Sequence, residues 1–145
     1  MIAILRFLFV IPIGFVAACF AAAAALLWPF LDVSADAFQD PFVVVELVFG
    51  FLAQAAQVGS IALIPWALFM VISEIGRLDS LLLHAVLGVV GGLAGERTIY
   101  GGGALSTSVE VAFLVAGLAF ALVYWIVAGR AAGHWRRRSE NSLQP

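Results

Sequence analysis

The chain has 145 residues, of which 64% are hydrophobic and only 11% are charged, and its mean hydropathy is +1.12. A water-soluble fold of this length has too little interior to bury so many apolar side chains, so the composition excludes a soluble domain and predicts one membrane-embedded domain. The net charge of −2 gives no electrostatic basis for nucleic-acid binding. A single cysteine, Cys19, excludes an internal disulfide.

The first apolar segment, about 7–31, follows Arg6 and is long enough to span a hydrocarbon core about 30 Å thick. Small residues recur at every fourth position and predict a face that a neighbouring helix can approach closely: Gly14, Ala18 and Ala22. Residues 16–19 also match the cleavage box of bacterial lipoproteins, which would leave a lipid on Cys19. Because the apolar run continues to Leu31, we expect an uncleaved anchor instead.

The second predicted helix, 41–72, opens with Asp40 as N-cap and Pro41 at its first position. It is long for one span, so we expect it to tilt or to place its first turn in the interface. Pro65 is expected to kink it. A short polar turn, 73–80, should follow.

The third predicted helix, 81–100, places four glycines in one sector about 100° wide, which predicts a helix-packing surface: Gly88, Gly91, Gly92 and Gly95. The triple glycine at 101–103 should end it. The fourth predicted helix, 109–128, follows a capping-box pattern formed by Thr107 and Glu110. We therefore predict an all-α, four-transmembrane-helix bundle over 1–130 and a basic, then polar, tail over 131–145.

Every basic residue is arginine, and six of the seven fall on one side of the predicted membrane. Arg97 is the exception, so the positive-inside rule predicts that both termini are cytoplasmic. The arginine and alanine bias is typical of a bacterial genome rich in G and C, which suggests a bacterial inner membrane. Four arginines of the tail could bind anionic lipid headgroups, or serve only as the orientation signal: Arg130, Arg136, Arg137 and Arg138.

A polar stripe on the second helix is the main candidate for chemistry: Glu46, Gln54, Gln57 and Ser60 lie within a sector of roughly 120°. The functional interpretation is an ion or proton site. The alternative is an interfacial carboxylate and two amides that hydrogen-bond between helices, each such bond being worth about 0.6 to 2 kcal/mol. His84, near the start of the third helix, is either a structural imidazole bonded to a carbonyl or a proton relay.

The chain resembles two families of small membrane proteins in general features. The size and helix count are similar to those of small multidrug-resistance exporters, but the first helix here has no ionisable residue after Arg6. The segment 91–97 resembles the glycine-rich opening of fluoride channels, but it stands in the third helix and lacks the Asn-containing motif downstream. No functional residue is carried over from either family.

No Ser-His-Asp arrangement or metal-ligand spacing can be assembled from the sequence, and we expect neither catalysis nor a cofactor. The first functional hypothesis is a non-catalytic accessory or scaffolding subunit that works as a homo-oligomer or within a larger membrane complex. The alternative is a small homo-oligomeric transporter or channel that uses the polar stripe and His84. The two hypotheses differ on whether Gln54 and Gln57 border a cavity or are packed between helices.

Overall fold

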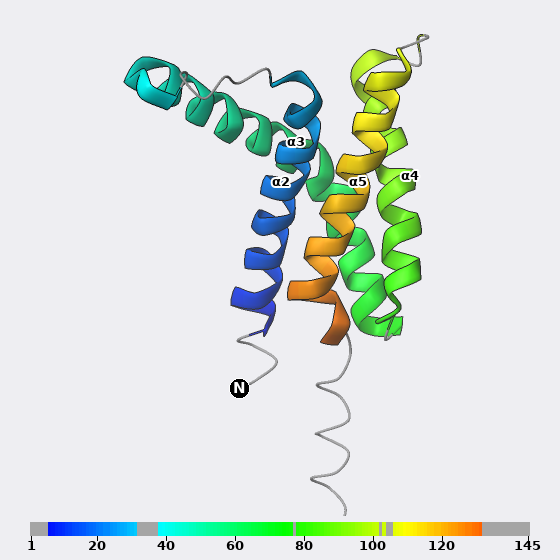
Figure 1. The fold of residues 1–145 in the computed structure, drawn as a ribbon. Helices are drawn as coiled ribbons and strands as arrows, with labels where there is room; N and C mark the ends of the chain where they lie inside the picture. The colour runs from blue at the N-terminus through cyan, green and yellow to red at the C-terminus, as the bar shows by residue number, and fades with distance from the viewer. Residues whose placement is uncertain (1–5, 32–37, 77, 102, 104–105, 132–145) are drawn as a thin grey trace, which may run out of the picture.

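The computed structural model describes residues 6–31, 38–76, 78–101, 103 and 106–131, and those residues form helices without any strand. Four helical segments are long and apolar enough to cross a membrane. This confirms the predicted all-helical fold with four helices of membrane-spanning length. The chain enters the first span and leaves the last one at the same end of the bundle, which we call the Arg6 end (Figure 1). The opposite end is called the Trp28 end.

The first span joins three helical pieces: η1 (Arg6–Val10), α2 (Ile11–Leu27) and η2 (Trp28–Phe30). Its predicted small-residue face is buried, as expected: Gly14, Ala18 and Ala22. A Cβ added to Gly14 would lie 3.3 Å from the Cβ of Ala128, at the end of the fourth span. Cys19 is also buried, beside Gly59 of the second span. Residues on both sides of Cys19 contribute to the packed interior.

The second span, α3 (Pro41–Gly76), is one helix of 36 residues and is about 54 Å long. The Phe42 amide donates to Oδ1 of Asp40 over 2.9 Å, which confirms the predicted N-cap. The helix ends four residues later than predicted, because Ser73 and Glu74 are buried and continue it to Gly76. Its first half leaves the bundle at a steep angle to α2, whereas its second half lies along the other helices (Figure 1). Pro65, which removes one backbone hydrogen bond, lies in that second half.

The third and fourth spans, α4 (Leu81–Tyr100) and α5 (Thr107–Val127), form a tight antiparallel pair. Gly101 ends α4 in the left-handed conformation, at φ 67°, so glycine stops this helix as predicted. The predicted capping box is wrong: α5 begins at Thr107, and Ser106 is its N-cap without a side-chain hydrogen bond. Thr107 therefore lies one position too late to cap the helix.

The fourth span, α5, is the central helix, because it packs against α2 on one side and α4 on the other. Small side chains on α5 allow α2 and α4 to pack closely against it: Ala112, Ala116 and Ala121 are buried. Toward the Arg6 end, a cluster of buried side chains forms the hydrophobic core: Ile11, Ala18, Tyr124 and Ala128. A short helix, η4 (Gly129–Ala131), follows.

Candidate functional site

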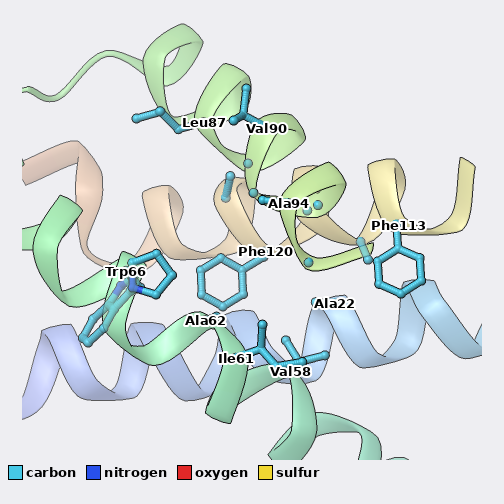
Figure 2. A pocket seen from close by; sticks show the side chains of 18 of the residues that line it. Ala22, Val58, Ile61, Ala62, Trp66, Leu87, Val90, Ala94, Phe113 and Phe120 are labelled. Carbon is cyan, nitrogen blue, oxygen red and sulfur yellow. The ribbon is translucent and has the colours of Figure 1, made fainter. Parts of the chain in front are cut away.

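A cavity of about 680 Å³ lies between α3, from Gln54 onward, and the α4–α5 pair. This volume is typical of small-molecule sites. Several residues line the cavity and are also exposed, namely Pro65, Leu87, Val90 and Ala94, so the cavity opens sideways between α3 and α4. Figure 2 shows α3 side chains such as Ile61 on one wall, Leu87 and Val90 of α4 opposite, and Phe120 of α5 between them.

The glycines of α4 divide between two roles, which corrects the prediction that all four pack helices. A Cβ on Gly88 or Gly92 would overlap main-chain oxygens of α5, at Gly117 and Phe113 respectively. All four glycines border the cavity, but a Cβ added to Gly91 or Gly95 would meet nothing within 4 Å. The reason is helical geometry: 88 and 92 lie on the stripe that touches α5, and 91 and 95 lie beside it.

Aromatic rings close the cavity toward the Arg6 end. Trp66 of α3 packs on Phe15 of α2 with ring centroids 4.3 Å apart, and it meets Tyr124 of α5 edge to face at 5.7 Å. Phe69 of α3 contacts the His84 ring of α4 at 4.9 Å. Aromatic pairs of this geometry are worth about 0.5–1.5 kcal/mol beyond their buried area, so they hold the four helices together at this end.

His84 is 2% exposed, and its ring is fixed by the backbone. Nδ1 lies 2.9 Å from the carbonyl oxygen of Ser80, and a carbonyl only accepts, so Nδ1 carries the proton of this bond. Among the described residues, neither Nε2 of His84 nor Nε1 of the Trp66 indole has a hydrogen-bond partner. The Nε2 atom faces Gly129, where an added Cβ would lie 2.9 Å from it. Its unshared electron pair is therefore directed at the protein and away from the cavity.

The predicted polar stripe does not act as one unit. Gln54 and Gln57 line the cavity, at the end nearer the start of α3. The Ser60 hydroxyl donates to the carbonyl oxygen of Gln57 over 2.8 Å and lies outside the cavity wall. Glu46 is exposed, because it lies on the half of α3 that leaves the bundle. A helical wheel treats every turn of α3 alike, whereas Gln54 and Gln57 border the cavity and Glu46 lies on exposed turns near the start of the helix.

The arginines predicted to bind lipid headgroups are not among the described residues of the cavity wall. Arg130 is exposed in η4, and Arg136, Arg137 and Arg138 lie outside the described residues. Within the described chain, no group of three or more His, Cys, Asp or Glu side chains could hold a metal ion.

Sequence reasoning missed the cavity itself and the parts that Ile61, Pro65 and Trp66 have in its wall. One signal was present in the sequence. Four glycines on one face of α4 exceed what a single helix contact uses, since that contact needs only Gly88 and Gly92.

Four helices long and apolar enough to cross a membrane indicate a multi-pass membrane protein. Comparison with protein-family models, with curated proteins and with solved structures finds no match.

Proposed function

We propose that this membrane protein is not an enzyme and that it holds a hydrophobic molecule, drawn from the bilayer, in the cavity between α3 and α4. The observation that carries the proposal is the wall: among the described residues, no Asp, Glu, Lys or Arg lines the cavity, and most of its side chains are apolar. Both helices that border the opening are long and apolar enough to span a membrane, which supports an opening at the depth of the lipid chains. A hydrophobic ligand can enter there without crossing water.

This proposal is closer to the transporter hypothesis than to a passive scaffold. Gln54 and Gln57 border the cavity, which is the arrangement that the transporter hypothesis requires. An ion pathway, however, needs polar groups along its whole length to replace the ion's water shell. Here the hydrogen-bonding side chains are few and gather at the ends of the cavity, so the wall favours a hydrophobic solute over an ion.

An accessory or scaffolding role is the second candidate, and the first half of α3 favours it. That half leaves the bundle, and two of its aromatic side chains are largely exposed: Phe42 at 84% and Phe49 at 68%. The exposed Glu46 carboxylate on the same half is costly to place against lipid. A second copy or another subunit that covered this half would remove that cost, and the cavity would then lie beside the interface.

We also propose that both termini are cytoplasmic and that the membrane is a bacterial inner membrane. The arginine distribution supports the orientation, since six of seven fall toward the Arg6 end of the assigned spans. In that orientation the exposed Arg130 and the arginines of the tail meet anionic headgroups, each contributing about 1 kcal/mol near the surface.

The test of ligand binding is to fill the cavity without disturbing the fold. Gly91→Leu combined with Gly95→Leu places two side chains where an added Cβ meets nothing, so the helix pair should stay intact. Gly50→Leu is the matched control, because Gly50 is equally open but lies outside the cavity wall. Native mass spectrometry should find a hydrophobic molecule on the parent protein and on the control, and at least tenfold less on the filled variant. Equal amounts on all three proteins would contradict the proposal.

A further inference from the structure

The hydrogen-bonding side chains of the cavity wall are not spread evenly. Gln54 and Gln57 of α3 lie at one end, and Thr98 of α4 lies at the same end because α3 and α4 run in opposite directions. From Gln54 to Phe69, which marks the other end, α3 rises about 22 Å. The wall between is apolar, with the flat surface of Gly91 and Gly95 on the α4 side.

The two glutamine side chains have unused hydrogen-bonding capacity. Neither carboxamide has a hydrogen-bond partner in the described part of the chain, although the backbone oxygen of Gln57 accepts from Ser60. Each carboxamide offers two N–H donors and one oxygen acceptor. The Thr98 hydroxyl already donates to the carbonyl oxygen of Ala94 over 2.8 Å, so toward the cavity it can only accept. This end of the cavity can therefore both donate and accept.

The opposite end cannot bind a polar group in the same way. Nδ1 of His84 is bonded to the Ser80 carbonyl oxygen, and Nε2 faces Gly129. The Trp66 indole N–H has no partner among the described residues, but it is buried and presents no accessible donor to a ligand. The His84 ring is stacked on Tyr124 and meets Phe69 edge to face, so the imidazole is surrounded by protein. The apolar end of a ligand fits here, against the aromatic rings.

We propose that the ligand is an uncharged amphipathic molecule, with an apolar chain along Gly91 and Gly95 and a terminal hydroxyl or carbonyl bound by the carboxamides of Gln54 and Gln57. This inference rests on the proposed function. An ionised headgroup is excluded on physical grounds, because no charged side chain among the described residues lines the cavity and an unpaired ion is costly in an apolar site. A hydroxyl or carbonyl carries no such cost, and it satisfies the two carboxamides.

The test compares four probes with the same chain length on the full-length protein in nanodiscs: dodecane, dodecanol, ionised dodecanoate and dodecyltrimethylammonium. Radiolabelled probes are measured by scintillation proximity. We expect dodecanol to bind about tenfold more tightly than dodecane and than either ion. Gln54→Leu combined with Gln57→Leu should remove the advantage of dodecanol over dodecane. Ser60→Ala, on the same helix but outside the wall, should keep that advantage.

The outcomes separate this inference from the function on which it rests. If dodecane binds and is lost from the Gly91→Leu, Gly95→Leu protein, but dodecanol has no advantage or an ion binds equally well, the cavity is a hydrophobic site and the proposed headgroup is wrong. If the Gln54→Leu, Gln57→Leu protein keeps the advantage of dodecanol, the assignment to these two residues is wrong. If no probe binds and filling the cavity changes nothing, the proposed function itself fails.

Discussion

Gly88 of α4 and Gly117 of α5 meet backbone to backbone, because a Cβ on either residue would overlap the main-chain oxygen of the other. Gly92 continues the same contact one turn later, where an added Cβ would overlap the Phe113 oxygen. Close approach of this kind is how membrane helices associate without a hydrophobic driving force between them. The contact makes α4 and α5 one rigid wall of the cavity.

The first prediction concerns this contact. Gly117→Ala should destabilise the protein by about 1–3 kcal/mol, since the new methyl group must push two backbones apart. Gly91→Ala is the control: its site is open, and alanine is the better helix former, so stability should stay equal or rise slightly. Unfolding in mixed micelles, followed by circular dichroism, measures both. Equal stability of the two variants would contradict the close approach.

The second prediction concerns the link between the ends of α4 and α5. The Trp125 indole N–H donates to the backbone oxygen of Asp79, just before α4, over 2.7 Å. Trp125→Phe keeps an aromatic ring but loses this bond, and should cost about 0.5–1.5 kcal/mol in the same unfolding measurement. Trp28→Phe should cost nothing measurable, because Trp28 is 80% exposed. Similar losses in both variants would count against a role for the Asp79 bond.

The third prediction concerns the start of α3. Asp40→Ala removes the N-cap bond to Phe42, worth about 1 kcal/mol, so amides in the first turn of α3 should exchange with deuterium roughly fivefold faster. Ser106→Ala at the start of α5 should leave exchange unchanged, because Ser106 makes no side-chain cap bond. An Asp40→Ala protein with unchanged exchange would show that the cap is not formed in the membrane.

The fourth prediction concerns orientation. In a Cys19→Ala background, Gln39→Cys should react with a membrane-impermeant maleimide on spheroplasts, because Gln39 lies just before α3, on the side predicted to be outside the cytoplasm. Ser142→Cys, in the tail, should react only after the membrane is permeabilised. The reverse pattern would overturn the proposed cytoplasmic position of the termini.

Hydrophobic length and small-residue spacing predicted the four spans, the buried face of Gly14, Ala18 and Ala22, and the glycine that ends α4. These features depend on one helix at a time, or on a backbone requirement that only small residues meet. The Asp40 cap was predictable for the same reason, whereas the capping box at Thr107 shifted by one residue, which is the usual uncertainty of a helix end.

The site could be predicted only in part, because it depends on how α3 crosses the bundle. A helical wheel places Glu46 and Gln57 on one stripe, but it does not show that α3 leaves the bundle between them. Nor does it show which glycines of α4 face α5 and which face an open volume. A helical wheel also gives no sign that Trp66 packs against Phe15 and Tyr124.

The inclination of α3 in the membrane links the width of the cavity to the thickness of the bilayer. A helix of about 54 Å fits a hydrocarbon layer about 30 Å thick only by inclining, and a thinner layer requires a greater inclination. Because α3 barely touches α4, while α4 and α5 are locked together, a change in inclination moves one wall of the cavity against a fixed one. If the cavity holds a ligand as proposed, vesicles made from short-chain and long-chain lipids should load the same protein to different extents.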